Sequence, residues 1–538
     1  MREFSGKSVN KKIAVGSITV LKKKELSVQE VKIEDAEQEI LRLNHAIEVS
    51  RKQLQELYDE ARNEVGESGA AIFKVHEMLL GDGGFLKAIH HMICEEEVSA
   101  EYAASMIGER YAARFQKMDN EYMKARAADM RNLSNRLVRN LSGDEDEKVC
   151  LTEPSIVYAE DFTPGEIIRM DRTKILALVS KDGAVNSHTV ILANMMNIPA
   201  LVGVSVEFSD IQNGMMAIVD GLEGKMILEP SENLLNDARK RLQQEKEHAA
   251  LLAQLKGKES KTSDGRKINI YANIGDLSDL SEVQENDAEG IGLFRSEFLY
   301  MGRADFPAEE EQFQVYKQIL KTMKEKKVVV RTLDLGADKQ VEYFPMEKEE
   351  NPALGYRGIR ICLKEPDIFK TQLRALLRAS VYGNLSVMYP MITSAEEVKR
   401  VLEILEEVKK ELDEEHISFK VPEQGIMIET PAAAMISDEL AELVDFCSIG
   451  TNDLTQYMLA ADRQNKYVEE FYNPRHKAVI KMMKMVVENV HKAGKWVGIC
   501  GELAGDETLT EEFVRMGADE LSVSPAQVLS VRKKIRDI

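Results

Sequence analysis

The stretch "DFCSIGTND", Asp445–Asp453, decides the fold of the C-terminal half of the chain. Its short apolar run stops abruptly at polar residues, and such a run indicates a strand that is buried on both faces. Buried strands of this kind belong to parallel sheets whose faces are covered by helices. Asn452 and Asp453 would then stand directly beyond the end of the strand.

The same pattern recurs from Thr262 to the end of the chain, with helical segments between the apolar runs. The candidate strands are residues 267–275, 290–297, 327–334, 385–391, 424–430, 445–453, 495–502 and 519–525. Strand-then-helix units repeated in this way over residues 262–538 predict a (β/α)₈ barrel of the TIM type. The alternative is an open doubly wound sheet, but its first strand should be followed by a Gly-rich dinucleotide turn, which the sequence lacks.

The N-terminal half combines two patterns. Residues 1–24 and 146–230 contain short apolar runs separated by Gly, Pro or Asp, which predicts a compact α/β domain. Residues 25–145 show helical periodicity over 31–65, 69–80, 99–118 and 120–143, which predicts a four-helix array inserted into that domain. The charged segment 231–261 is interpreted as a linker helix. We therefore expect a multidomain chain: α/β domain with a helical insertion, linker, then barrel.

Composition limits the compartment and the partners. The five cysteines are scattered without a C-x-x-C pair, which favours a reducing cytoplasm over a disulfide frame or a zinc cluster. The net charge of −21 argues against nucleic acid as a partner and fits an enzyme with a basic protein partner. Neither a signal peptide nor an apolar run long enough for membrane insertion is evident.

Polar side chains follow most of the candidate barrel strands, and the C-terminal strand ends are where barrel enzymes carry their chemistry. A single arginine at a strand end is more often part of a surface ion pair, but six such ends together favour a site. Arginines offer planar forks to phosphate or carboxylate oxygens, and carboxylates offer hard ligands to Mg²⁺. We expect a phosphorylated, carboxylate-bearing small molecule to bind among Asn273, Arg295, Glu297, Arg331, Asp334, Glu429, Asn452, Asp453, Cys500 and Glu502.

The long segment 335–360 between the third and fourth strands carries Lys339, Arg357 and Arg360 among glycines and prolines. Segments of this length inside a barrel are usually functional, although a solvated basic loop is the alternative. Cys500 ends an apolar strand, where a cysteine is usually an inert small hydrophobe. Beside a polar site, however, a thiol of ordinary pKa could donate a proton to carbon.

His188 lies in "VNSHTVILAN", Val185–Asn194, where Asn186 or Ser187 could cap a helix that starts at the histidine. One interpretation is an imidazole that hydrogen-bonds a neighbour in the capping region. The other is a nucleophile that takes a phosphoryl group, with the free N–H groups of the helix start stabilising the dianion. The stretch alone does not decide between them.

Several motifs together resemble one known family. These are "SHTVILAN", "AEGIGLFRSEFLYM", "VVVRTLDLGADK", "EENPALGYRGIR", "GIMIETPAAA", "FCSIGTNDLTQYMLAADR" and "VGICGELAGD". In this order they are similar to Enzyme I of the sugar phosphotransferase system, the phosphoenolpyruvate–protein phosphotransferase. The barrel motifs occur throughout the wider phosphoenolpyruvate-utilising superfamily, whereas the helical insertion is characteristic of Enzyme I.

The resemblance implies a role for each candidate residue. His188 would be the phosphorylated nucleophile, and Cys500 would protonate the enolate to give pyruvate. The barrel residues would bind phosphoenolpyruvate and Mg²⁺: Arg295, Arg331 and Arg357 the phosphate, with Lys339 nearby, Asn452 and Arg463 other parts of the substrate, and Glu429 and Asp453 the metal.

The resemblance also implies partners. The phosphoryl group would pass to a histidine of the small phosphocarrier HPr, docked on the helical insertion around His76, Met78, Leu79 and Arg126. A homodimer would form through the barrel. The chain departs from the family pattern near the active histidine at Ala184, Val185 and Asn194, and in the insertion at Gly69, Gly83 and Gly84. We expect these departures to change phosphohistidine stability and the strength of HPr docking.

Other activities fit the sequence less well. A pyruvate phosphate dikinase or phosphoenolpyruvate synthase needs an ATP-binding domain ahead of the histidine domain, whereas the N-terminal region here is helical and has no Gly-rich nucleotide loop. A relay protein without turnover would not need the set of arginines and carboxylates. A lyase that uses only the barrel would need neither His188 nor the helical insertion.

Overall fold

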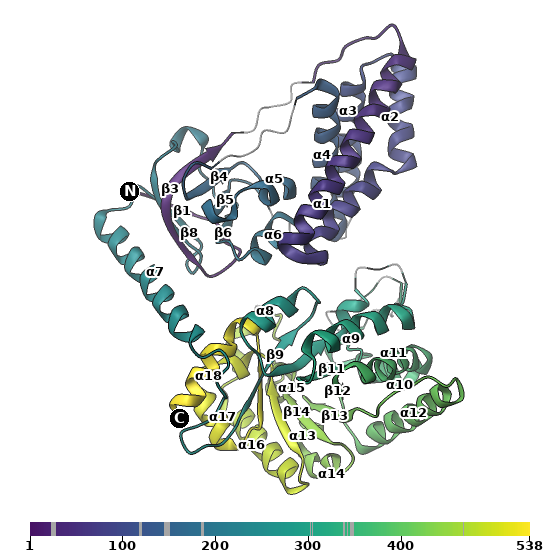
Figure 1. The fold of residues 1–538 in the computed structure, drawn as a ribbon, viewed down its shortest axis with the longest axis vertical. Coiled ribbons are helices and arrows are strands. Elements are labelled where there is room, and N and C mark those ends of the chain that lie inside the picture. The colour runs from purple at the N-terminus through teal and green to yellow at the C-terminus, as the bar shows by residue number, and fades with distance from the viewer. Residues whose placement is uncertain are drawn as a thin grey trace. The chain divides into compact units, whose positions relative to one another are not determined.

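The computed structural model describes residues 1–22, 28–117, 121–144, 151–183, 188–301, 303, 305–336, 339, 341, 343–344, 349–465 and 467–538. Of residues 67–68, 121–125 and 188 only the backbone is described. The chain divides into two compact units, Met1–Glu247 and His248–Ile538, which are treated separately below (Figure 1).

The first unit contains an eight-stranded sheet in the order β1-β8-β7-β3-β4-β5-β6-β2. Its strands are β1 (Arg2–Ser5), β2 (Lys7–Ser8), β3 (Ile13–Leu21), β4 (Ser155–Ala159), β5 (Ile175–Ser180), β6 (Ala200–Val202), β7 (Met216–Asp220) and β8 (Lys225–Leu228). β3 pairs in parallel with β4, although the whole helical segment separates them in the sequence. The predicted insertion of the helices into the α/β domain is therefore confirmed.

The inserted helices are α1 (Ala36–Leu80), α2 (Gly83–Glu96), α3 (Ala100–Gln116) and α4 (Glu121–Ser142). The range α1 holds two helices joined at a kink, where Gly66 has a non-helical backbone with φ +77° and ψ −178°, so the prediction of a separate helix over 69–80 is confirmed. The helix α2 was not predicted. It forms because the Asp82 side chain caps the Phe85 N–H and because Phe85, Ile89, Met92 and Ile93 bury one face.

The helical insertion and the α/β domain share one hydrophobic core. Two short helices of the α/β domain, α5 (Pro164–Arg169) and α6 (His188–Met195), lie against α1. A Cβ atom on Gly165 would be 3.2 Å from Leu57 of α1, and one on Gly69 would be 3.2 Å from Met195 of α6. The glycines thus permit close approach between the helices.

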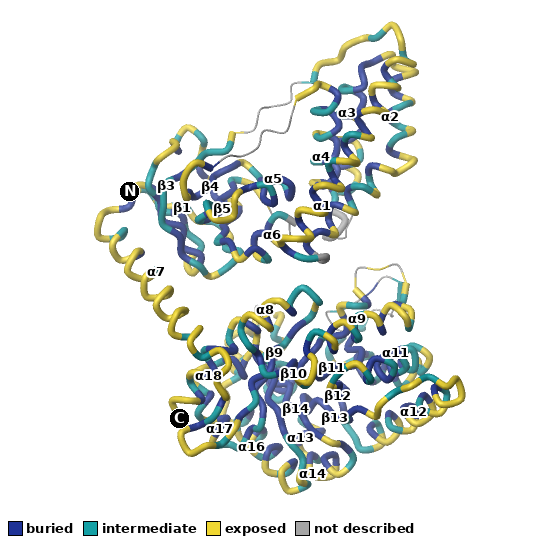
Figure 2. Tube along the Cα trace, viewed as in Figure 1, coloured by how far each residue is buried: buried dark blue, intermediate teal, exposed yellow. Residues whose placement is uncertain are grey.

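The helix α7 (Glu232–Ala253) follows the last strand of the sheet and crosses the division between the two units. Among its residues only Ala238 is buried, and Figure 2 shows the helix exposed along most of its length. This agrees with the charged helix expected between the two halves of the chain.

The second unit is a closed barrel, in which each strand pairs in parallel with its neighbours and β16 closes onto β9. The strands are β9 (Asn269–Ile274), β10 (Gly290–Arg295), β11 (Lys327–Arg331), β12 (Asn384–Tyr389), β13 (Glu423–Ile428), β14 (Phe446–Gly450), β15 (Trp496–Cys500) and β16 (Glu520–Val523). Each coincides with a predicted strand, and the (β/α)₈ prediction is confirmed.

Helices surround the barrel. They are α8 (Asp279–Glu285), α9 (Glu309–Met323), α10 (Ile359–Lys364), α11 (Pro366–Ala379), α12 (Ala395–Glu414), α13 (Pro431–Met435), α14 (Ser437–Ala441), α15 (Thr451–Leu459), α16 (Lys477–Lys492), α17 (Thr510–Met516) and α18 (Val528–Asp537). Alternate strand residues face these helices, so Cys447 and Ile449 join the large outer core. Phe446 belongs instead to a small apolar cluster inside the barrel.

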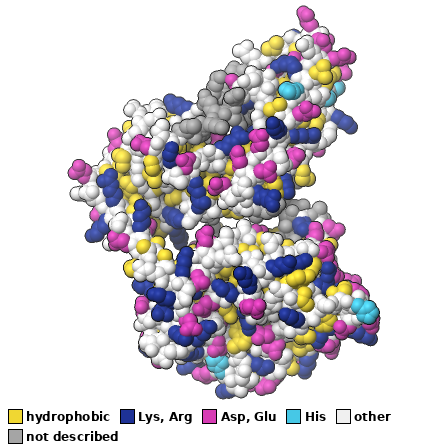
Figure 3. Space-filling model, viewed as in Figure 1, with side chains coloured by type: hydrophobic (Ala, Val, Ile, Leu, Met, Phe, Trp, Pro, Cys, Tyr) yellow, Lys and Arg dark blue, Asp and Glu magenta, His cyan; other side chains and the backbone are white. Residues whose placement is uncertain are grey.

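No helix in the described part of the chain is long and apolar enough to cross a membrane. On the face drawn in Figure 3, lysine and arginine side chains are interspersed with aspartate and glutamate.

Candidate active site

A cavity of about 460 Å³ opens at the C-terminal ends of the barrel strands. With the exception of Arg357, all the barrel residues assigned a role from the sequence line it: Arg295, Arg331, Lys339, Glu429, Asn452, Asp453, Arg463 and Cys500. Two further strand-end residues, Glu297 and Glu502, also contribute to the lining. The closed barrel brings together side chains that are far apart in the sequence, because all its strands end at the same rim.

One side of the cavity carries an ion-pair network. The Glu297 carboxylate lies 2.5 Å from an Arg331 guanidinium nitrogen and 2.6 Å from Lys339 Nζ. Asp334 Oδ2 lies 3.3 Å from each of the same two cations. Burial raises the pKa of Glu297, but Arg331 and Lys339 lower it more, so the net pKa is below its ordinary value. The network fixes both cations at the cavity wall.

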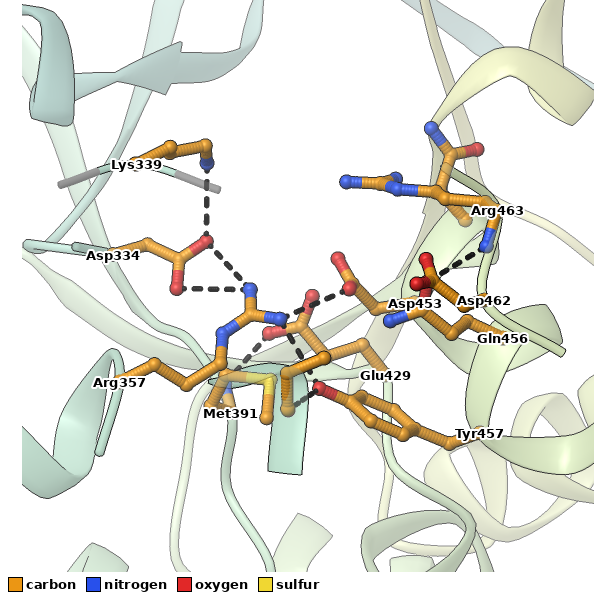
Figure 4. A network of polar contacts seen from close by, with 12 residues as sticks. Asp334, Lys339, Arg357, Met391, Glu429, Asp453, Gln456, Tyr457, Asp462 and Arg463 are labelled. Atoms are coloured by element: carbon orange, nitrogen blue, oxygen red, sulfur yellow. Dashed lines mark hydrogen bonds and ion pairs between the residues drawn. The ribbon is translucent and has the colours of Figure 1, made fainter. Parts of the chain in front are cut away.

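Arg357 lies beneath this network rather than on the cavity wall. Its guanidinium contacts Asp334 at 3.2 Å on one side, and Asp453 at 3.2 Å and the Tyr457 hydroxyl at 3.1 Å on the other. Figure 4 shows the guanidinium between the two carboxylates. Arg357 thus links Asp334 and Asp453, which come after two different strands. Its contacts hold the two carboxylates in position.

Tyr457 had no predicted role. It follows Asp453 by four residues on α15, and residues at this spacing share a helix face, so the sequence did contain a signal for it. The predicted loop residue Arg360 lies elsewhere: its guanidinium donates to the carbonyl oxygens of Leu354 and Gly355, both at 2.8 Å. It stabilises its own loop and does not reach the cavity lining.

Two arginines on the cavity wall have side chains that make no hydrogen bond or ion pair with another described residue. Arg295 ends β10 and is half-buried, and Arg463 follows α15 and is likewise half-buried. Figure 4 shows Arg463 and Lys339 on opposite sides of the space near the Asp453 carboxylate. Both arginines are therefore available to an anionic ligand in the cavity.

Glu429 and Asp453 form a carboxylate pair on the cavity wall. Glu429, 1% exposed, follows β13, and its Oε1 accepts a hydrogen bond from the Met391 N–H at 2.6 Å. Burial and the neighbouring negative charges of Asp453 and Asp334 raise the pKa of Glu429 to about 8, against the lowering effects of the two arginines Arg331 and Arg357. An additional cation in this position would favour ionisation of both carboxyl groups.

This carboxylate pair fits a divalent metal ion. Among the described residues no group of three or more His, Cys, Asp or Glu side chains could hold a metal by itself. Mg²⁺ is commonly bound by one or two carboxylates, with substrate oxygens and water completing the shell. The chemistry of the donors and the raised pKa of Glu429 thus agree with a metal that binds together with an oxygen-rich substrate.

Cys500 ends β15 on the cavity floor and is 1% exposed. Its Sγ donates to the Ile449 carbonyl oxygen at 3.4 Å, and burial raises the pKa of the thiol to about 12. The expectation of an ordinary thiol pKa is therefore wrong, because the inner face of the barrel excludes water from the sulfur. A thiol of this pKa stays protonated at neutral pH and can act as an acid.

His188 is the first residue of α6 in the other unit. Its side chain and residues 184–187, including Ala184 and Val185, lie outside the described part of the chain, so capping by Asn186 or Ser187 stays a prediction. The neighbouring Thr189 hydroxyl donates to the Phe162 carbonyl oxygen at 2.7 Å, which anchors the helix start. Asn194 near the end of α6 is exposed.

The predicted partner-binding residues differ in exposure. Met78 is 75% exposed and Leu79 is half-buried, whereas His76 is only 5% exposed and lies 3.2 Å from Asp129. Arg126 contacts the same carboxylate at 3.3 Å. Of the glycines that depart from the family pattern, Gly83 and Gly84 are exposed. Gly69 is buried against α6, so it does not belong to the exposed surface for which a changed docking strength was expected.

A barrel with arginines, a carboxylate pair and a thiol at one rim defines the class of phosphoenolpyruvate-utilising enzymes, and three family descriptions match the chain accordingly. The PEP-binding domain of PEP-utilising enzymes matches residues 249–538, their N-terminal domain residues 5–126, and their mobile domain residues 151–224. The chain belongs to the phosphoenolpyruvate-protein phosphotransferase family. The predictions of this family and of a phosphotransferase are confirmed.

Curated relatives match along the whole chain. The phosphoenolpyruvate-protein phosphotransferase of Priestia megaterium is 42% identical over 539 residues, which cover 100% of this chain and 94% of that protein. The protein of the same name from Bacillus subtilis (strain 168) is 41% identical over 544 residues, covering 99% and 94%. That of Staphylococcus carnosus is 38% identical over 541 residues, covering 100% and 94%.

Proposed function

We propose that the chain transfers the phosphoryl group of phosphoenolpyruvate to its own His188, releases pyruvate, and then passes the phosphoryl group to a histidine of HPr. This is the first step of the sugar phosphotransferase system. One observation carries the proposal: Arg295 and Arg463, which have no partner among the described residues, line the same cavity as the Glu429–Asp453 pair and the Cys500 thiol. The cavity thus offers cations, metal ligands and a proton donor to one small anion.

The cations would bind the two anionic groups of the substrate. Arg295, Arg331 and Lys339 would hold the phosphate, because Arg331 and Lys339 are fixed by Glu297 and Asp334. Arg463 and Asn452 would hold other parts of the substrate from the opposite side. Arg357, which was predicted to bind phosphate, would instead keep Asp334 and Asp453 in place.

The family acts on phosphoenolpyruvate with the help of a divalent metal, and we propose Mg²⁺ held by Glu429 and Asp453. Bound there, Mg²⁺ would neutralise charge on the phosphoryl oxygens. Ionisation of Glu429 would accompany binding, because its pKa of about 8 leaves it largely protonated at neutral pH.

In the reaction, the His188 imidazole forms an N–P bond while the bond between phosphorus and the enol oxygen breaks. The enolate of pyruvate remains in the cavity, and the Cys500 thiol gives its proton to carbon 3 of the enolate. Formation of the keto product makes phosphoenolpyruvate an energetic donor, which drives formation of the labile N–P bond. The transition state disperses charge over oxygen, so positioned cations are the main requirement.

We further propose the partners and the domain limits. HPr would dock on the helical insertion over Met78 and Leu79, with the His76–Asp129–Arg126 contacts supporting that surface from below. A homodimer would form through the barrel, and the four described cysteines, all free, support a cytoplasmic location. We assign residues 1–24 with 146–230 to the phosphohistidine domain, 25–145 to the HPr-binding domain, 231–261 to the linker, and 262–538 to the barrel.

Incubation with phosphoenolpyruvate and Mg²⁺ tests the proposal. We expect acid-labile phosphate on His188 and one pyruvate released per phosphate, and we expect neither from H188Q. Labelling that depends on ATP would favour a dikinase instead. If the wild type binds phosphoenolpyruvate but stays unlabelled, the chain is a relay without turnover. When the wild type is labelled, addition of the HPr of the same organism should remove the phosphate from His188.

A further inference from the structure

A polar layer lies inside the barrel on the side of Cys500 that faces away from the cavity. Alternation along the strands turns Ser448, Gly498 and Glu520 inward, because their neighbours Ile449, Ile499 and Leu521 join the outer core. Glu520 is 1% exposed, and neither its Oε1 nor Ser448 Oγ makes a hydrogen bond of ordinary geometry with a described residue, although Ser522 lies close to the carboxyl group and Ser448 close to the Cys500 thiol. Buried polar atoms without a protein partner usually hold water or serve a reaction.

The layer reaches from Glu520 to the thiol. A Cβ atom on Gly498 would overlap Glu520 Oε2, so the carboxyl group occupies the space that this glycine leaves. Gly498 pairs with Ser448 on one neighbouring strand and with Glu520 on the other, and it precedes Cys500 by two residues on the same face. Glu520, Ser448 and Cys500 therefore surround one stretch of β15.

A second hydroxyl group, that of Ser522, lies beside Glu520 on the strand next to Cys500. A Cβ atom on Gly292 would overlap both Glu520 Oε1 and Ser522 Oγ, so these two polar atoms share the space over one glycine. Ser522 is the strand partner of Cys500 and donates to Asn273 Oδ1 at 2.6 Å. Serine hydroxyls thus lie between the carboxyl group and the thiol on two neighbouring strands.

The layer approaches solvent at the N-terminal end of the barrel. Lys327 Nζ lies 2.6 Å from Glu423 Oε2, and these side chains are 18% and 41% exposed. The charged and titratable groups facing Glu520 are Lys327, Asp519 and Tyr271. Burial raises the pKa of Glu520 to about 8, against the lowering effects of Ser522 and Lys327, so the carboxyl group carries a proton at neutral pH.

We propose, building on the function proposed above, that Glu520 returns the proton to Cys500 from inside the barrel after each turnover. Once the thiol has protonated the enolate, the thiolate takes a proton from the Ser448 or Ser522 hydroxyl or from a water between them. That group takes the carboxyl proton of Glu520. The carboxylate then takes up one proton from bulk solvent, which reaches it through water at the Lys327–Glu423 end. One proton enters from solvent for each proton that leaves in pyruvate.

The direction of transfer follows from the two acids. The pKa of Cys500, about 12, lies above that of Glu520, about 8, so the thiolate is the stronger base and the proton moves toward sulfur. The route is also separate from the cavity, where bound substrate would hinder access of water to the sulfur. Glu520 would thus supply protons without opening the active site.

The variant E520Q removes the acidic proton and keeps the shape of the side chain. With enzyme in excess over phosphoenolpyruvate, the first turnover uses the proton already on Cys500, and we expect E520Q to release pyruvate within 2-fold of the wild-type rate. With excess phosphoenolpyruvate, Mg²⁺ and HPr, we expect kcat to fall at least 10-fold without a change in KM. The wild-type kcat should decrease as pH rises through 8, and E520Q should lack this decrease.

E442Q is the control, because it makes the same change in an exposed carboxylate at the end of α14, outside the layer. It should keep kcat within 2-fold. S448A gives a second test that leaves Glu520 in place, and its kcat should fall at least 3-fold while the decrease with pH remains. Wild-type kcat in both S448A and E520Q overturns the proposal; if E520Q does not fold, S448A decides. Absence of pyruvate from the wild type overturns the proposed function instead.

Discussion

The two ends of the barrel each bury a glutamate, and the two carboxyl groups share a pKa of about 8 for different reasons. At the cavity end, burial of Glu429 is reinforced by the negative charges of Asp453 and Asp334. At the other end, burial of Glu520 dominates and the nearby Lys327 opposes it. The first arrangement is suited to a metal cation beside its carboxylates, whereas the second holds a proton. Similar pKa values can thus indicate different chemistry.

The largest effect is expected from E429Q, which tests the metal side of this comparison. The amide cannot ionise, so the second carboxylate ligand is lost and pyruvate formation should fall by about 10³-fold, as expected when several kcal/mol of charge stabilisation disappear. Titration with Mn²⁺ followed by electron spin resonance measures the metal affinity directly. E520Q makes the same change at the other end of the barrel and should bind Mn²⁺ as the wild type does. An equal loss of Mn²⁺ affinity in both variants would contradict the assignment of only Glu429 as a metal ligand.

The next largest effect concerns the ion-pair network at the cavity end. R357A removes the cation between Asp334 and Asp453 and leaves buried charges uncompensated, so the barrel should lose about 3–5 kcal/mol of unfolding free energy. Urea unfolding followed by tryptophan fluorescence measures this loss, because the chain has one tryptophan and Trp496 stacks on Phe446 inside the barrel at 4.4 Å.

R295A is the matched control for R357A, because the Arg295 side chain has no ion pair with another described residue. We expect its unfolding free energy to change by less than about 0.5 kcal/mol, as for substitutions that disturb no buried interaction. Its affinity for phosphoenolpyruvate should nevertheless fall at least tenfold, by roughly 1.4 kcal/mol. An R295A variant as unstable as R357A would contradict the distinction between positioning and substrate-binding arginines.

A smaller effect is expected from C500S, which tests the thiol that lies between the cavity and the polar layer. The serine hydroxyl is a much weaker acid than the thiol, so pyruvate formation should fall by about 10²-fold, the lower range for loss of general acid catalysis. Binding of phosphoenolpyruvate, measured by calorimetry, should remain unchanged. If C500S binds the substrate more weakly by the same factor, the thiol contributes to binding and not to proton transfer.

The last comparison separates the two glutamates by the pH dependence of the unfolding free energy. The pKa of Glu520 is about 8 in the folded chain, above its ordinary value of 4.5. The folded state therefore keeps a proton that the unfolded state has released. This stabilisation is complete below pH 4.5 and disappears as pH rises to 8, at roughly 1.4 kcal/mol per pH unit. E520Q should remove this pH dependence of the unfolding free energy, with or without Mg²⁺.

Glu429 should likewise make the unfolding free energy decrease as pH rises. Mg²⁺ should remove this contribution, because the metal stabilises the ionised carboxylate. Urea unfolding of the barrel between pH 5 and pH 8, with and without saturating Mg²⁺, resolves the two contributions. If Mg²⁺ has no effect on the pH dependence of the wild type, Glu429 is not a metal ligand.

The sequence was most informative for the barrel strands and for the residues at their ends. Each strand is an apolar run stopped by a polar residue, and closure of the barrel places all these ends at one rim, so Arg295, Glu429 and Cys500 could be assigned to one site without any contact being known. In the helical insertion the sequence indicated the break near Gly66 but not the helix α2. Two glycines at the start of α2 weaken its pattern, and only the packed face and the Asp82 cap establish the helix.

Pairings between charged groups could not be derived from the sequence. Arg331 ends β11 and Arg357 comes after that strand, yet Arg331 lines the cavity and Arg357 lies behind it between two carboxylates. Their difference depends on the path of the segment from 332 to 356, which local preferences do not determine. The pKa of Cys500 was missed for a related reason, because burial inside the barrel depends on which face of β15 turns inward.

The sheet of the first unit has a consequence for folding during synthesis. β3 and β4 are neighbours, and β1 at the start of the chain pairs with β8, which ends at Leu228. The inserted helices make mostly local contacts and can form as soon as they leave the ribosome, whereas each of these pairings must close a long loop. The N-terminal strand β1 therefore stays without its partner until translation has passed Leu228, and the helices are complete before the domain that holds them.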